Sequence, residues 1–298
     1  MKYLILIIIS FVMFTTCKNH KKNMTIEELK NNIEKKIKTL EGDFAFAFLN
    51  LSNPEEKIIL NADEKFHAAS TMKVPVMIEV FKQARNGKFN LSDSIVVKNK
   101  FKSIVDGSIY KLDLDEDSGE NLYGKIGKKV TIEKLVYEMI TVSSNLATNI
   151  LIDLTDAKNV TSTMKKLGAE NMIVLRGVQD IKAYEKGLSN STTVKDLLII
   201  MKSIATGKAG NKKDCERMIE ILKDQKLNNM IPKYYPENIT VAHKTGSITG
   251  VHHDAGIIYL PNGKAFILVI LSKNLENFEK TTDALAKISK ETLDFMLQ

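Results

Sequence analysis

The residues with the clearest chemical potential are Ser70 and Lys73, in the stretch Ser70-Thr71-Met72-Lys73. An apolar pattern from Val74 to Phe81 predicts a buried helix that begins at this stretch and ends near Gly87. A spacing of three residues places the hydroxyl and the amine on one helix face. A serine hydroxyl needs an adjacent base to act as a nucleophile, and a buried lysine with a lowered pKa can supply one. The free N–H groups at a helix start also favour negative charge on an attacked carbonyl.

The same four letters recur at Ser162-Thr163-Met164-Lys165. This copy is followed by Lys166-Leu167-Gly168, which is typical of a helix end. Lysines in a last turn face the negative end of the helix dipole, so we interpret this copy as a solvated helix end. The tetrapeptide alone therefore does not identify a catalytic serine.

Two further polar motifs follow in chain order. Ser143-Ser144-Asn145 separates two apolar helical patterns, and we expect it to line a cleft. Lys244-Thr245-Gly246 lies on a predicted strand that leads into a hairpin.

The elements that must position these motifs predict an α+β fold. A capping box at Thr25 and Glu28 begins a helix to about Leu40, and strands follow over 43–51 and 57–60. Three more strands are predicted over 240–247, 254–260 and 265–272, before a last helix. We expect one antiparallel sheet made by both chain ends, with flanking helices. Within a domain of residues 25–298, the sheet part would comprise about 25–65 and 239–298, and the helical part about 66–238.

The composition and the amino terminus bear on class and location. The 298 residues are 44% apolar and 27% charged, as in a globular protein, and the net charge of +7 comes almost entirely from lysine. Without an arginine-rich stripe we expect no nucleic-acid partner. Residues 1–17 resemble a bacterial lipoprotein signal that ends at Cys17, and 18–24 form a polar tether. We expect a monomer exported to the periplasmic side of the cell envelope and lipid-anchored at Cys17, although ordinary signal cleavage or an uncleaved anchor remains open.

Together the three motifs resemble those of class A β-lactamases and penicillin-binding proteins. The resemblance implies that Ser70 attacks a β-lactam or acyl-D-amino-acid carbonyl, that Lys73 takes or relays the proton, and that Ser143 protonates the leaving nitrogen. It implies that Asn145 binds the substrate amide and that Lys244 and Thr245 bind its carboxylate. Gly246 would allow close approach of the sheet edge, and the N–H groups of Ser70 and Ser247 would hold the oxyanion.

The chain departs from the family pattern at two places. Ser144 stands where the family usually has Asp, and the loop over 169–190 lacks the Glu-x-x-Leu-Asn sequence that supplies the deacylating base. Asp180 and Glu185 are the candidate replacements, with plain loop surface as the alternative for each. Without such a base, the protein would act as a penicillin-binding or D-Ala peptidase-like protein, as another serine hydrolase, or as a binding protein that β-lactams acylate without turnover.

No metal or other cofactor is expected. The neighbours His252 and His253 would face opposite sides of a strand, which argues against a metal site. The acidic stretch 113–120 lacks the spacing of a calcium-binding EF-hand, so we interpret it as a solvated loop.

Overall fold

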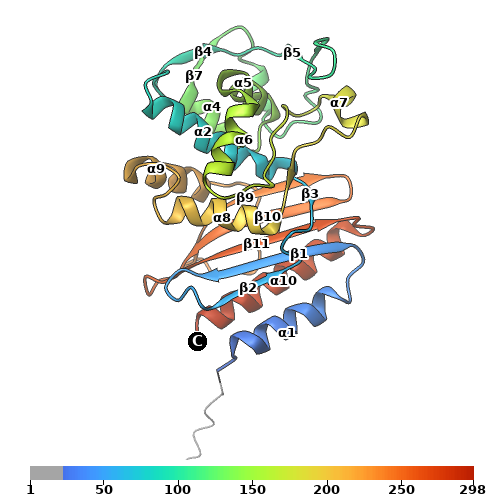
Figure 1. The fold of residues 1–298 in the computed structure, drawn as a ribbon, viewed down its shortest axis with the longest axis vertical. Helices are drawn as coiled ribbons and strands as arrows, with labels where there is room; N and C mark the ends of the chain where they lie inside the picture. The colour runs from blue at the N-terminus through green and yellow to red at the C-terminus, as the bar shows by residue number, and fades with distance from the viewer. Residues whose placement is uncertain (1–22) are drawn as a thin grey trace, which may run out of the picture.

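The fold places a five-stranded antiparallel sheet between two groups of helices (Figure 1). A computed structural model describes residues 23–298. The helices are α1 (Ile26–Ile37), the 3-10 helix η1 (Ala69–Met72), α2 (Lys73–Arg85), α3 (Glu120–Tyr123), α4 (Ile132–Thr141), α5 (Asn145–Thr155), α6 (Ala157–Lys166), α7 (Ile181–Glu185), α8 (Val194–Ala205), α9 (Lys212–Lys223) and α10 (Phe278–Met296). The strands are β1 (Asp43–Asn50), β2 (Lys57–Leu60), β3 (Phe66–His67), β4 (Ser94–Val96), β5 (Phe101–Lys102), β6 (Ile109–Tyr110), β7 (Lys129–Thr131), β8 (Ser191–Thr192), β9 (Thr240–Ile248), β10 (Val251–Tyr259) and β11 (Ala265–Lys273).

The large sheet joins the two ends of the chain, as the sequence predicts. Its strand order is β2-β1-β11-β10-β9, and β1 pairs with β11 from Asp43 opposite Lys273 to Asn50 opposite Phe266. The predicted α+β architecture is therefore confirmed. Strand β9 lies at the edge of this sheet, where it contacts η1.

Each face of the sheet buries its own apolar core. On β1, the phenylalanines Phe44, Phe46 and Phe48 pack with α1 and α10, while the small residues Ala45 and Ala47 face α8 and the helical region. Because side chains alternate along a strand, the Phe-x-Phe-x-Phe pattern gives β1 one bulky and one flat face. The flat face allows the helices that carry the site to pack closely on the sheet.

The helical region contains short strand pairs that the sequence does not reveal. These pairs are β3 with β8, β4 with β7, and β5 with β6. The expected loop over 169–190 includes the helix α7 and a bridge between Ile173 and Ser191. The β3–β8 pair includes His67 and lies next to Asn190, and both residues line the pocket described below.

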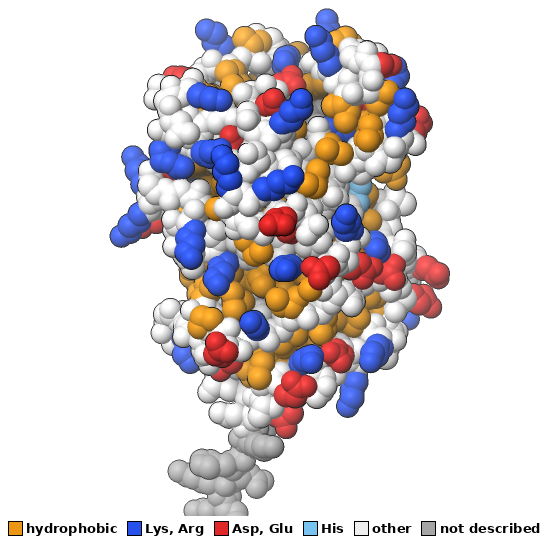
Figure 2. Space-filling view, viewed as in Figure 1, with side chains coloured by type: hydrophobic (Ala, Val, Ile, Leu, Met, Phe, Trp, Pro, Cys, Tyr) orange, Lys and Arg blue, Asp and Glu red, His pale blue; other side chains and the backbone are white. Residues whose placement is uncertain are grey.

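The surface and the termini add three observations. On the face shown in Figure 2, Lys and Arg side chains are spread over the surface instead of gathering in one patch. No helix within 23–298 has the length and apolarity needed to cross a bilayer. Cys215 is a buried free thiol, and Cys17 lies outside the described residues.

Candidate active site

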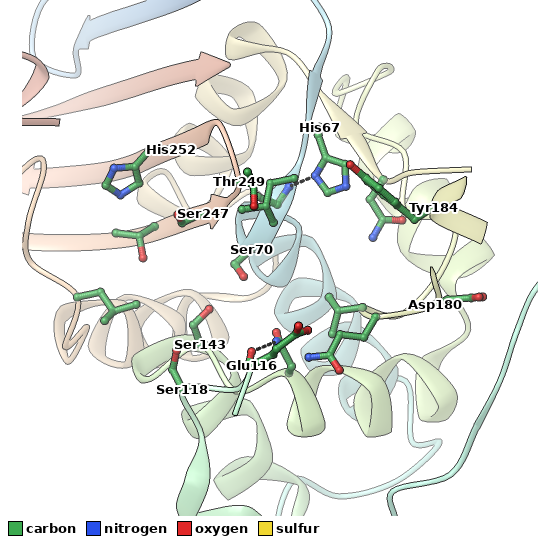
Figure 3. A pocket seen from close by; sticks show the side chains of 18 of the residues that line it. His67, Ser70, Glu116, Ser118, Ser143, Asp180, Tyr184, Ser247, Thr249 and His252 are labelled. Carbon is green, nitrogen blue, oxygen red and sulfur yellow. Dashed lines mark hydrogen bonds between the residues drawn. The ribbon is translucent and has the colours of Figure 1, made fainter. Parts of the chain in front are cut away.

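Ser70 lies in a short 3-10 turn at the junction between strand β3 and helix α2. The sequence predicts Ser70 in the first turn of an α-helix, but η1 spans Ala69–Met72 and α2 begins only at Lys73. Ala69 has a φ of 45°, which is costly for a residue with a Cβ. Two hydrogen bonds hold this turn, because Ala69 N donates to His67 Nδ1 at 3.0 Å and Ala68 N donates to the Asn190 carbonyl at 2.9 Å. The turn directs Ser70 into a pocket of about 600 Å³ (Figure 3).

Lys73 is completely buried at the start of α2. Its Nζ donates to the Ser143 carbonyl at 2.7 Å, to Ser143 Oγ at 3.1 Å and to Asn145 Oδ1 at 2.9 Å. Burial lowers the pKa of Lys73 well below its usual value, and the charge of Lys244 lowers it further, while the Asp117 carboxylate opposes both effects. A neutral amine at this position can accept a proton near pH 7.

Ser143 connects the two lysines of the site. It follows α4 with a φ of 59°, and its Oγ accepts hydrogen bonds from Lys73 Nζ and Lys244 Nζ, each at 3.1 Å. Because both lysines donate to its lone pairs, the hydroxyl proton of Ser143 is free to point into the pocket. This arrangement suits the transfer of a proton to a bound group.

Lys244 lies on the edge strand β9 and is fully buried. Burial lowers its pKa to about 7, against the opposing effect of Asp254. Its Nζ also donates to the Thr245 carbonyl at 2.8 Å. Thr245 and Ser247 both line the pocket, and Figure 3 shows Ser247 on the same side of it as Ser70.

Gly246 brings β9 against the turn that carries Ser70. A Cβ built on Gly246 would lie 3.0 Å from Ser70 N and 3.0 Å from Thr71 N. A side chain at this position would therefore separate the strand from the N–H groups of η1. The resemblance implies that Gly246 lets this sheet edge approach a ligand, which stays a prediction; the structure shows the strand close to the turn that carries Ser70.

The two proposed deacylating carboxylates do not face Ser70. Asp180 is 2% exposed, and its oxygens accept hydrogen bonds from Ser103 Oγ, Ile104 N and Ala183 N at 2.8, 2.9 and 3.2 Å. The carboxylate points away from Ser70 in Figure 3. Asp180 is also the N-cap residue of helix α7. Glu185 is exposed at the end of α7 and does not line the pocket. Both predictions need correction. The Asp180 carboxylate is hydrogen-bonded to Ser103 and Ile104, and the Glu185 side chain faces solvent.

Several pocket residues carry no sequence signal. Gln179 has a φ of 58°, its Oε1 accepts from Asp113 N at 3.0 Å, and its Nε2 is buried without a partner within 23–298. His67 lines the pocket beside Tyr184. Burial and the nearby Arg176 lower the pKa of His67, so its ring is neutral at pH 7. Because Nδ1 accepts the Ala69 N–H, the ring proton lies on Nε2.

The acidic stretch 113–120 differs from the solvated loop expected from its sequence. Asp113 and Asp115 are exposed, but Asp117 is 5% exposed and bonds to the start of α5. Among the described residues no group of three or more His, Cys, Asp or Glu side chains is placed to hold a metal ion.

Comparisons with known proteins agree with this geometry. Beta-lactamase VEB-1 of Pseudomonas aeruginosa is 24% identical over 293 residues, which cover 92% of each chain. Beta-lactamase Toho-1 of Escherichia coli is 25% identical and covers 89% of this chain and 90% of its own. The crystal structure of a beta-lactamase from Sphaerobacter thermophilus is 26% identical, with a TM-score of 0.77 over 92% of this chain and 99% of that chain.

A solved structure named PBP-A has the same fold, with 23% identity and a TM-score of 0.76 over 91% of this chain and 97% of that chain. The model of the Beta-lactamase enzyme family matches residues 27–296. The match covers nearly the whole described chain and all three motifs. The chain therefore belongs to the beta-lactamase enzyme family and is a hydrolase of that type.

Proposed function

We propose that this protein opens β-lactam rings through an acyl-enzyme formed on Ser70, without a metal or cofactor. The observation that carries the proposal is the convergence of Lys73 and Lys244 on Ser143 Oγ, at 3.1 Å each, in the pocket that Ser70 lines. The names of the relatives, including VEB-1 and Toho-1, support the choice of β-lactam substrates.

In the proposed acylation, Ser70 Oγ attacks the lactam carbonyl and its proton passes to neutral Lys73. The C–N bond of the ring then breaks, Ser143 donates its proton to the departing nitrogen, and protonated Lys73 returns a proton to Ser143 Oγ, which lies 3.1 Å from its Nζ. The N–H groups of Ser70 and Ser247 hold the oxyanion. Protonated Lys244 and Thr245 bind the substrate carboxylate, and Asn145 binds the side-chain amide.

A second candidate function is slow turnover, as in a penicillin-binding protein or a peptidase acting on D-Ala peptides of the cell wall. The observation that favours it is the pocket wall at Val178, Gln179 and Asp180, where the first two side chains carry no carboxylate and the third points away. An amide such as Gln179 cannot remove a proton from water. Acylation would then proceed while hydrolysis of the acyl-enzyme lags.

One experiment separates the two candidates. Purified protein is mixed with a chromogenic β-lactam, and absorbance is followed together with the mass of the intact protein. Sustained turnover supports the lactamase, whereas a stoichiometric burst with a stable adduct on Ser70 supports the slow-turnover protein. Absence of both adduct and turnover would contradict the proposed chemistry and leave a hydrolase of other esters or amides.

Export and anchoring are a separate proposal, which rests on the sequence of residues 1–17. We propose a monomer on the periplasmic side of the cell envelope, held to the membrane through Cys17. Replacing Cys17 by Ala should move the protein from the membrane fraction to the soluble fraction of a bacterial expression host. An unchanged distribution would exclude lipidation at Cys17.

A further inference from the structure

Asp117 lies outside the three motifs but contacts the second of them directly. Its Oδ1 accepts hydrogen bonds from Asn145 N at 2.8 Å and from Gly119 N at 2.9 Å, and its Oδ2 accepts from Leu146 N at 2.8 Å. These short bonds to a buried carboxylate are of the strong, charge-assisted type. The loop around Asp117 is thereby joined to the first turn of α5.

The first turn of α5 is the part of the helix that faces Lys73. Ser144 caps this helix by accepting from Ala147 N at 3.2 Å, so Asp117 satisfies the two N–H groups that Ser144 does not reach. A negative charge at this helix start is also favoured by the helix dipole. The neighbouring Glu116 carbonyl accepts from Asn145 Nδ2 at 3.2 Å, which orients Asn145 Oδ1 toward Lys73 Nζ.

Ser143 needs such support because its backbone is strained. Its φ of 59° places it in the left-handed region, which a residue with a Cβ occupies only when its surroundings impose it. Lys73 holds the carbonyl of Ser143 from one side. Asp117 fixes the chain just after Ser143 from the other side.

The loop also explains why the second motif contains a serine at position 144. A Cβ built on Gly119 would lie 2.4 Å from Ser144 Cβ and 2.4 Å from Ser144 Oγ, so the two backbones approach very closely. This contact leaves little room for a larger side chain at 144. The carboxylate that family members carry in the motif is found here on the facing loop.

We propose that Asp117 is a positioning residue for acylation, which caps α5 and so holds Ser143 and Asn145 around Lys73 in place of the carboxylate missing at position 144. The inference rests on the proposed acylation of Ser70. It assigns a functional role to a loop outside the recognised motifs.

The charge of Asp117 gives the role a measurable signature. The charged groups that act on Lys73 are Lys244 from β9, which lowers its pKa, and Asp117, which raises it. Asp117 itself is faced by the Tyr123 phenol from α3, whose pKa is raised by burial and by this carboxylate. Removing the Asp117 charge should therefore lower the pKa of Lys73, so that neutral Lys73 persists to lower pH.

The test measures the rate constant of acylation by a β-lactam against pH in the full chain and in Asp117→Asn. Asparagine turns an N–H donor toward the helix N–H groups, so we expect the plateau rate constant to fall about 10- to 100-fold. The midpoint of the acidic limb should move to lower pH. Asp117→Ser, which removes the charge without placing an NH2 group against the helix N–H groups, should show the same midpoint shift with a smaller loss of rate.

Asp115→Asn is the matched control, because it removes an exposed carboxylate from the same loop. It should retain the wild-type plateau and midpoint. Asp117 variants with lower thermal stability but wild-type plateau and midpoint would overturn the proposal and leave Asp117 a purely structural cap.

Hydrogen exchange separates this inference from the proposed function. In Asp117→Asn the amides of Asn145 and Leu146 should exchange faster than in wild type, whether or not any β-lactam reacts. Unchanged exchange at both amides would overturn the capping role. Absence of acylation in the wild-type protein would instead contradict the proposed function.

Discussion

Two identical tetrapeptides in this chain have opposite surroundings. In Ser70-Thr71-Met72-Lys73 the lysine is fully buried and the serine opens into the pocket, whereas Ser162 and Lys165 in the second copy are both exposed on α6. The first copy begins the buried helix α2 beside β9, and the second ends a helix. The chemistry of a serine and a lysine three residues apart is therefore set by the elements around them.

The second copy still contributes to the first. Thr163, which is buried, hydrogen-bonds through its hydroxyl to Glu79 on α2 and accepts from Lys82 Nζ at 2.6 Å. Glu79 is 1% exposed and also accepts from Gln83 Nε2 at 2.8 Å. Through Thr163, the second copy of the tetrapeptide thus stabilises α2, the helix that begins with Lys73.

The largest expected effect comes from the two serines. Ser70→Ala should abolish the covalent adduct with a β-lactam, because it removes the oxygen that attacks the carbonyl. Ser162→Ala should form the adduct at the wild-type rate, since Ser162 faces solvent. Intact-protein mass spectrometry after incubation measures both. An adduct that still forms in Ser70→Ala would show that Ser70 is not the nucleophile, so the first tetrapeptide would not differ from the second in this respect.

The two lysines sharpen the contrast. Lys73→Met should reduce the acylation rate constant about 10³-fold, the size of effect typical of a lost general base. Lys165→Met removes the same charge from an exposed helix end and should leave the rate unchanged. Stopped-flow measurement with a chromogenic β-lactam gives both rate constants. Equal rates in the two variants would show that Lys73 is not the proton acceptor.

The smallest effect is expected at Thr163. Thr163→Val removes the hydroxyl between Glu79 and Lys82 and should lower the free energy of unfolding by about 1–3 kcal/mol. Acylation should be nearly unaffected, because the contact lies on the far part of α2 from Lys73. Urea denaturation measures the change, with Ser162→Ala as a neighbour expected to stay within about 0.5 kcal/mol of wild type. An unchanged stability would mean that the second copy has no supporting role.

The sequence predicts those helices and strands whose signals lie within a few neighbouring residues. Thr25 and Glu28 form the expected capping box, and the alternation of Phe44, Phe46 and Phe48 gives the expected strand. The motifs around Ser70, Ser143 and Lys244 are brought into contact as their order in the chain suggested. The roles of these residues in catalysis remain predictions.

The parts that the sequence did not reveal depend on distant partners. The carboxylate of Asp117 binds amides 28 and 29 residues along the chain, and that of Asp180 binds groups 76 and 77 residues away. In both cases the residue lies in a polar stretch that looks solvated when it is considered alone. The left-handed φ values of Ala69 and Gln179 likewise carry no sequence mark, because tertiary contacts impose them.

The pairing of β1 with β11 has a consequence for biosynthesis. Because Asp43 pairs with Lys273, β1 cannot complete its pairing until β11, the last strand of the sheet in chain order, has been synthesised. Until then the β1–β2 hairpin leaves one edge unpaired, the kind of edge that promotes aggregation of nascent chains. Contacts so distant along the chain slow folding, so the synthesis of β11 determines when the sheet can close, although no residue of β11 lines the pocket.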